Sequence, residues 1–77
     1  MTSPPTIAQW IRGVRTAAGL TQAAMAKRLA RAPQTIGVWE SGRGVPPLDV
    51  ALRMLQTIPS RDRVAWLVRL EEVDPDA

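Results

Sequence analysis

The sequence predicts an all-α domain of five short helices, and three observations lead to that prediction. Apolar residues recur at intervals of three and four in five separate segments, which is the spacing of one helix face. Capping residues, glycines or prolines separate these segments. No stretch alternates apolar and polar residues as a strand would, and the 77 residues suffice for one domain only.

The first segment predicts a helix at Ile7–Ala18. Thr6 suits the N-cap position, and Gln9 three residues later completes a capping-box pattern. Gly19 supplies the stop, since glycine readily adopts the left-handed conformation found at helix ends. The apolar stripe of this helix consists of Ile7, Trp10, Ile11, Val14 and Ala18.

The next two segments predict helices at Gln22–Ala30 and Pro33–Ser41, separated by only two residues. Thr21 is the N-cap candidate of the former, and the fixed φ of Pro33 suits the first position of the latter. Their apolar stripes are Met25, Ala26 and Leu29, then Ile36 and Trp39. Two short helices joined by a tight turn are typical of a helix-turn-helix, although any small helical bundle can contain such a pair.

The last two segments predict a helix from Leu48 to Ile58, closed off by Pro59, and a helix at Arg61–Val73 capped by Ser60. The expected core stripe of the former is Leu48, Ala51, Leu52, Leu55 and Ile58.

Cysteine and histidine are both absent, which excludes disulfides, Cys/His zinc sites and thiol or imidazole nucleophiles. No nucleophile–base pair or metal-ligand set is evident, so the sequence predicts a non-enzymatic protein without cofactor, metal or small-molecule ligand. No apolar run approaches the roughly 18 residues of a membrane span. The N-terminus lacks a signal pattern, so a cytoplasmic location is expected.

Charge is unevenly distributed along the chain. The net charge is +3, with +5 through Pro59 and −2 from Ser60 onward. A basic body with an acidic tail is compatible with a polyanionic partner on one side, and equally with a mildly basic, solvated surface.

The helix predicted at Pro33–Ser41 has an unusual outer face. A helical wheel places Pro33, Ile36, Trp39 and Glu40 on one side and Gln34, Gly37, Val38 and Ser41 on the other. The latter face carries no charge, although a solvated face usually bears Lys and Glu. Such a face suits a DNA major groove, where Gln pairs with an adenine edge and Val contacts a thymine methyl.

The segment Gly19–Pro46 resembles the helix-turn-helix of Cro/repressor-type (XRE-like) transcriptional regulators. The matching residues are Gly-Leu-Thr-Gln at 19–22, Met25-Ala26, Thr35-Ile36, Trp39-Glu40-Ser41-Gly42-Arg43 and Pro46. With the flanking helices in the expected places, the resemblance covers about Ile7–Ile58. It implies a five-helix, lambda-repressor-like domain that binds double-stranded DNA.

The resemblance, together with the wheel, implies roles for individual residues. Base contacts are expected from Gln34, Gly37 and Val38, although Gln34 could also be an exposed residue without a role. Phosphate contacts are expected from Gln22, Thr21, Thr35, Ser41 and Arg43, with Thr21 better suited to capping. Lys27, Arg28 and Arg31 fit either phosphate contacts or a solvated face. The family habit of a buried ion pair assigns Arg15 to Glu40.

Three departures from the family pattern affect these expectations. Ala32 stands where a Ser or Thr cap is usual, which costs about 1 kcal/mol of helix stability. Pro33 and Gly37 replace polar residues, so direct base contacts are expected to be sparse, with DNA shape contributing more.

The C-terminal helix is apolar on two sides. Val64, Leu67 and Val68 are expected to pack on the domain, whereas Trp66, Leu70 and Val73 form a second stripe. This stripe predicts a two-fold homodimer, and a helix wedged within the monomer is the alternative. The expected interface is Val50, Met54, Trp66, Leu70 and Val73. The expected organisation is a disordered lead-in at 1–5, a DNA-binding domain at 6–59 and a dimerisation helix with acidic tail at 60–77.

The leading hypothesis is therefore a dimeric repressor that binds an inverted-repeat operator, typical of autoregulators from phages or other mobile elements. Anti-CRISPR-associated repressors, restriction-system controllers and antitoxins share the same domain, and the sequence does not choose among them. The rival hypothesis is a protein–protein adaptor built on the same bundle, with Trp66 as its interface anchor.

Overall fold

All five predicted helices are present in the computed structural model, which describes residues 4–74. They are α1 (Ile7–Ala17), α2 (Gln22–Arg28), α3 (Pro33–Glu40), α4 (Leu48–Leu55) and α5 (Ser60–Glu71). No strand occurs within these described residues, so the predicted all-α class is confirmed. The expected lead-in at 1–5 and the end of the acidic tail fall largely outside them.

The helix boundaries differ from the predicted ones mainly at the C-terminal ends. α2 stops two residues early because the chain enters the left-handed region at Ala30, where φ is 55°. α4 stops at Leu55 because residues 56–58 form a turn. The Arg63 guanidinium holds this turn by donating to the carbonyls of Leu55, Gln56 and Ile58 at 3.2–3.3 Å.

Both predicted side-chain caps before α1 and α2 are present, whereas the later helices have none. Thr6 and Gln9 exchange hydrogen bonds of 2.9 and 3.1 Å, which completes the capping box of α1. The Thr21 hydroxyl accepts from the backbone N–H of Ala24 at 3.1 Å. Ser60 was expected to cap the last helix, but it begins α5 and Pro59 occupies the cap position.

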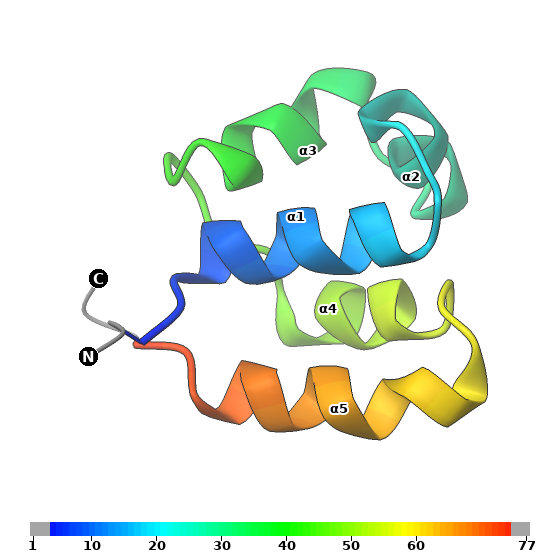
Figure 1. Ribbon diagram of the computed structural model, residues 1–77. Coiled ribbons are helices and arrows are strands. Elements are labelled where there is room, and N and C mark those ends of the chain that lie inside the picture. The colour runs from blue at the N-terminus through cyan, green and yellow to red at the C-terminus, as the bar shows by residue number, and fades with distance from the viewer. Residues whose placement is uncertain (1–3, 75–77) are drawn as a thin grey trace.

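α1 lies between two pairs of helices (Figure 1). α2 and α3 pack against each other on one side of it, and α4 and α5 lie on the other side. α3 and α5 consequently occupy opposite sides of the molecule.

The core is aliphatic with two tryptophan anchors. Its buried residues are Trp10, Ile11, Val14, Met25, Ala26, Leu29, Ile36, Trp39, Val50, Ala51, Met54, Leu55 and Ile58. The expected core stripe of α4 is wrong in part, since Leu48 and Leu52 are exposed by 71% and 46%. Val50 and Met54 are fully buried in their place, so these two side chains are not at the surface where a partner copy could reach them.

α5 is attached to α1 through Trp66. The Trp10 indole N–H donates to the Trp66 carbonyl at 2.8 Å, and the Trp66 ring lies against Gly13. A Cβ at position 13 would lie 2.6 Å from that ring, so only glycine allows this approach. Leu70 and Val73 also pack on the core.

The two faces of α5 are therefore exchanged relative to the sequence-based expectation. The stripe expected at a dimer interface packs against the core instead; it consists of Trp66, Leu70 and Val73. Because Gly13 has no side chain, the Trp66 indole can lie directly against the backbone of α1. The outward stripe is the one expected to pack on the domain, namely Val64, Leu67 and Val68.

Candidate nucleic-acid interface

The turn between α2 and α3 is fixed by backbone hydrogen bonds. The N–H of Arg31 donates to the Ala26 carbonyl at 2.9 Å, and the N–H of Ala30 donates to the Lys27 carbonyl at 3.2 Å. These two bonds form a Schellman motif around the left-handed residue Ala30. The motif lets only four residues separate the end of α2 from the start of α3, so the pair forms a tight helix-turn-helix.

α3 has one buried face and one exposed face, as the wheel predicted, except that Pro33, expected on the inner side, is exposed. Ile36, Trp39 and Glu40 are buried, while Gln34 is exposed and Val38 is 37% exposed. The exposed face contains no ionisable group between Pro33 and Ser41. No side chain caps the helix at Ala32, as expected, and in its first turn the N–H of Thr35 donates to the Ala32 carbonyl at 3.0 Å instead.

Gly37 lies in the middle of this exposed face. A Cβ there would lie 3.5 Å from Gln22 Oε1, which is an ordinary contact distance. Packing within the protein therefore does not require glycine at this position. What the missing side chain provides is a flat place on the outer face of α3.

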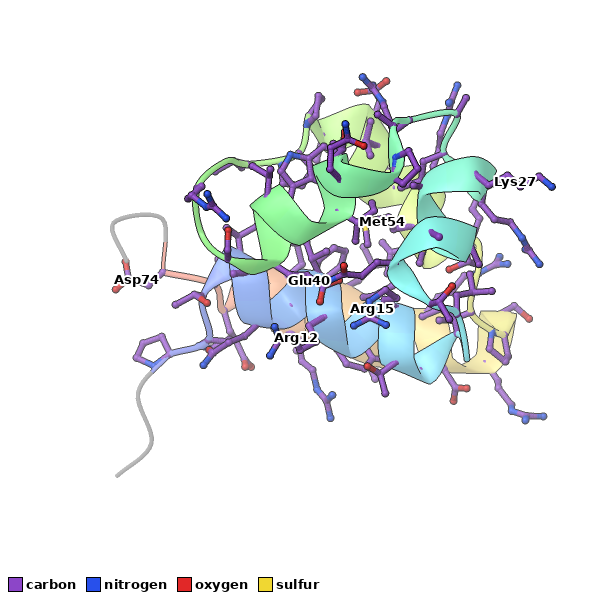
Figure 2. All side chains as sticks on the ribbon, turned by 90° about the horizontal axis from the view of Figure 1, so that it is seen from above. Arg12, Arg15, Lys27, Glu40, Met54 and Asp74 are labelled. Atoms are coloured by element: carbon purple, nitrogen blue, oxygen red, sulfur yellow. The ribbon has the colours of Figure 1, made fainter. Side chains whose placement is uncertain are left out.

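Glu40 anchors α3 to α1. Its side chain is 1% exposed and accepts from Arg15 Nε at 2.6 Å and Arg15 Nη2 at 3.0 Å, which is the ion pair predicted from the sequence. Arg12 Nε adds a third donor at 3.2 Å and Gln22 Nε2 a fourth at 3.4 Å. Figure 2 shows Glu40 facing Arg12 and Arg15 on the adjacent helix.

Burial favours the neutral form of the Glu40 carboxyl, but its hydrogen bonds outweigh that effect. The donors Arg15, Arg12 and Gln22, with the charge of Arg15, hold the pKa of Glu40 below its ordinary value. The bond to Glu40 raises the pKa of Arg15 in turn. Sequence reasoning missed Arg12 as a partner, although its place three residues before Arg15 puts both on one helix face.

The end of α3 holds Arg43 in a defined position. The Ser41 hydroxyl donates to the Val38 carbonyl at 2.8 Å and accepts from Arg43 Nε at 3.1 Å. The bond to Ser41 engages Nε and leaves the two terminal guanidinium nitrogens to other acceptors. Both residues are exposed beside the outer face of α3, where the sequence placed phosphate contacts.

The remaining expected phosphate contacts differ in their surroundings. Gln22 is exposed, but its amide lies in the seam between α2 and α3, where it donates to Glu40. Thr21 caps α2, and Thr35 is half-buried in the first turn of α3. Three cations are exposed on or just after α2, namely Lys27, Arg28 and Arg31. Lys27 points outward in Figure 2.

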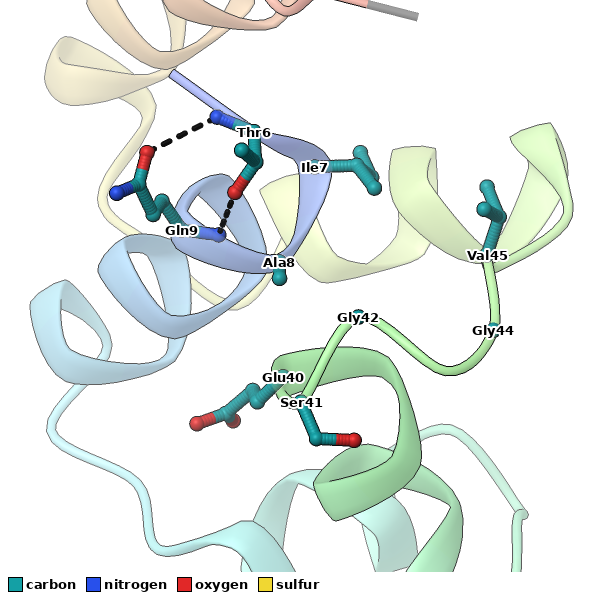
Figure 3. Close-up of a pocket in the computed structure, with 9 residues that line it drawn as sticks. All are labelled: Thr6, Ile7, Ala8, Gln9, Glu40, Ser41, Gly42, Gly44 and Val45. Carbon is teal, nitrogen blue, oxygen red and sulfur yellow. Dashed lines mark hydrogen bonds between the residues drawn. The ribbon is translucent and has the colours of Figure 1, made fainter. Parts of the chain in front are cut away.

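An open pocket of about 410 Å³ lies between the N-terminal turn of α1 and the loop after α3 (Figure 3). Its polar groups are engaged with one another or with neighbours: Thr6 with Gln9, Ser41 with Val38, and Glu40 with the arginines. The pocket therefore presents no acid–base pair available for catalysis among its described lining residues.

Two further findings concern ligands and membranes. The described residues contain no group of three or more acidic side chains placed to hold a metal ion. Within residues 4–74, no helix has the length and apolar character needed to cross a membrane.

Comparison with known proteins gives one positive result. Residues 7–58, from α1 to the turn after α4, match a family model described as a helix-turn-helix domain. Neither the curated proteins nor the solved structures contain a match to the chain. The family match ends before α5.

Proposed function

Because the chain belongs to the helix-turn-helix domain family, we propose that it is a sequence-specific repressor that places α3 in the major groove of double-stranded DNA. The observation that best supports this proposal is the outer face of α3, which is exposed, uncharged and flat at Gly37, and is bordered by Ser41 and Arg43. A groove-reading face needs small or amide-bearing residues that reach base edges, and the cations that hold phosphates belong at its margin.

The proposed contacts follow from these positions. Gln34 reads a base near the N-terminal end of α3, and Gly37 and Val38 approach the groove floor. Arg43, held by Ser41, neutralises a phosphate and fixes the register. Gln22, Thr21 and Thr35 are proposed as weaker phosphate contacts, since Gln22 and Thr21 already take part in bonds within the protein. In this proposal, the bound protein represses transcription by occupying a promoter, and the proposed target is the promoter of its own mobile-element operon.

Gly37→Ala gives the sharpest test of this function. A methyl group at this position meets only Gln22, and alanine stabilises a helix interior by roughly 0.5–1 kcal/mol relative to glycine. The variant is therefore expected to melt at a higher temperature. Its affinity for DNA is expected to fall, because the added methyl group makes the outer face of α3 less flat. A variant that gains stability and binds the duplex as well as wild type would contradict the assignment of this face.

Two further variants separate base reading from phosphate binding. Gln34→Ala is expected to cost about 1–3 kcal/mol on the cognate duplex and little on a scrambled one. Arg43→Ala is expected to weaken binding to both and to reduce the salt slope by about 1 per subunit. Mobility shifts with the region upstream of the chain's own coding sequence, at several salt concentrations, provide the measurement. Equal loss on both duplexes for Gln34→Ala would remove it from the reading residues.

A protein–protein adaptor remains the second candidate, favoured by the exposed apolar stripe of α5. Trp66, its expected anchor, is unavailable because it packs on Gly13. Absence of any DNA binding at low salt, together with loss of a partner on substitution of Val64 or Leu67, would favour the adaptor.

A further inference from the structure

The Trp39 side chain carries a hydrogen-bond donor that the rest of the domain does not use. The residue is only 6% exposed, yet its indole N–H has no acceptor among residues 4–74. The indole N–H of the other core tryptophan, Trp10, donates to the Trp66 carbonyl at 2.8 Å. Every side-chain nitrogen or oxygen sealed from solvent in the described part of the chain has a partner, so the Trp39 N–H must reach the surface.

Gly44 lies over the edge of the Trp39 indole and leaves this N–H accessible. A Cβ at position 44 would lie 3.4 Å from Trp39 Cδ1 and 3.7 Å from Trp39 Nε1. The φ of Gly44 is not positive, in contrast to those of Gly19 and Gly42, so the backbone conformation does not require glycine here. What glycine provides is bare backbone next to the N–H, and any other residue would place a side chain over it.

The opening at Gly44 borders the outer face of α3. The same Cβ would lie 3.3 Å from Val38 Cγ1, and Val38 is 37% exposed on that face. Val38 Cγ1 and Trp39 Nε1 thus both lie within 4 Å of one point. The pocket of Figure 3 is bordered by Gly44 and Val45 but not by Trp39, so the N–H does not open into it. The donor therefore reaches the surface at the margin of the groove face.

A cation is fixed at the same margin. The Val38 carbonyl accepts from the backbone N–H of Arg43 at 3.1 Å and from the Ser41 hydroxyl at 2.8 Å. The Ser41 hydroxyl in turn accepts from Arg43 Nε at 3.1 Å. No acidic residue occurs between positions 41 and 48. An indole N–H can only donate, and beside a guanidinium it favours an acceptor that carries negative charge.

We propose that the Trp39 indole N–H donates, through the opening at Gly44, to a phosphate oxygen of the DNA backbone when α3 lies in the major groove. This inference rests on the DNA-binding function proposed above. Trp39 belongs to the C-terminal end of α3, whereas residues near the N-terminal end of a recognition helix reach base edges. Because the core holds the indole rigidly, little side-chain entropy is lost when the contact forms. Trp39 is then both a core residue and an uncharged phosphate contact.

Trp39→Phe removes the N–H and keeps an aromatic ring. The dissociation constant is expected to rise about tenfold on a duplex from the region upstream of the chain's own coding sequence, and equally on a scrambled duplex. The slope of log affinity against log salt concentration is expected to stay at the wild-type value, because a neutral donor releases no counterion. Arg43→Ala lowers that slope, so the salt titration separates the two kinds of phosphate contact.

Trp10→Phe is the matched control, because it also removes an indole N–H from the core, but one that is bonded within the protein. It is expected to lower the melting temperature and to leave the affinity for DNA unchanged at a temperature where both variants are folded. A Trp39→Phe protein that binds both duplexes as well as wild type would overturn the contact. A loss confined to the cognate duplex would overturn the phosphate as acceptor, since only a base edge depends on sequence.

Gly44→Ala tests the opening itself, since it keeps the N–H and covers it with a methyl group. The variant is expected to bind both duplexes more weakly than wild type. In a Trp39→Phe background the same substitution is expected to cost much less affinity, because the donor that it covers is already absent. An undiminished loss in that background would overturn the link between the opening and the N–H.

Nuclear magnetic resonance tests the contact in the wild-type protein, so it does not depend on how the variants fold. The Trp39 indole N–H signal, assigned through its connectivity to the backbone, is expected to exchange with water in the free protein. When the duplex saturates the protein, the signal is expected to move downfield and to become protected, while the Trp10 signal stays unchanged. An unchanged Trp39 signal in the saturated complex would overturn the inference and leave the proposed function standing. Wild type that binds neither duplex at low salt would overturn both.

Discussion

Substitution of Glu40 is expected to destabilise the fold more than any other single change to its ion pairs. Glu40→Gln removes the charge that balances Arg15, whose side chain is 19% exposed and therefore cannot hydrate freely. Breaking a buried pair costs about 3–5 kcal/mol. Arg15 keeps its bond to the Leu20 carbonyl at 3.0 Å, so we expect the lower end, about 3 kcal/mol.

The melting temperature is the convenient measure of this loss. A change of 1 kcal/mol shifts the midpoint of a domain of this size by about 4–8 °C, so Glu40→Gln should melt about 12–24 °C below wild type. Arg12→Ala is the matched control, because its side chain is 65% exposed and such a pair contributes less than about 1 kcal/mol. Circular dichroism melts of Glu40→Gln, Arg15→Ala and Arg12→Ala provide the comparison.

The pH dependence of stability tests the same network independently. Because the folded pKa of Glu40 is lowered, its ionised form contributes stability that is complete above the unfolded value of about 4.3. That contribution disappears as the pH falls through the folded pKa. Wild type should therefore lose stability on acidification more steeply than Glu40→Gln. If wild type and Glu40→Gln melt within about 3 °C of each other at neutral pH, the reasoning is refuted, because an unpaired buried charge should destabilise the fold by more than that.

Five further substitutions test local features of the fold by thermal melts. Ala30→Gly is expected to stabilise the fold by about 0.5–1 kcal/mol, because the strain of a Cβ-bearing residue in the left-handed conformation exceeds the extra backbone entropy that glycine loses on folding. Gly19→Ala and Gly42→Ala, at φ of 71° and 81°, should destabilise the fold instead. Ala32→Ser should add about 1 kcal/mol by capping α3, and no gain would mean that the serine hydroxyl does not accept from the N–H groups of the first turn. Gly13→Ala should cost about 1–2 kcal/mol through its clash with Trp66, and a loss undiminished in a Trp66→Leu background would place the strain elsewhere.

The elements of the fold could be predicted because their signals are local. The capping box at Thr6 and Gln9, the cap at Thr21 and the proline at the start of α3 each act within one helical turn. The inward placement of Glu40 followed from its position on the wheel of α3. Such features depend on neighbours along the chain, which a single sequence displays.

Which face of a helix packs inward is a different kind of question. α5 carries two apolar stripes, and the choice between them is made by Gly13, which lies on another helix and opens the seat for Trp66. The same holds on α4, where Val50 and Met54 rather than Leu48 and Leu52 enter the core. Periodicity identifies both stripes but contains no information about the surface that each one meets.

The central position of α1 restricts how its sequence can vary. Its buried residues form the core, its arginines hold Glu40, and Gly13 receives Trp66. Even its exposed Gln9 and Thr16 are committed, to the capping box and to the Arg12 carbonyl. Ala17 is left as the exposed position of the helix with no side-chain role. A change in α1 therefore requires a matching change in α3 or α5, so the packing of these two helices shares a single set of sequence constraints.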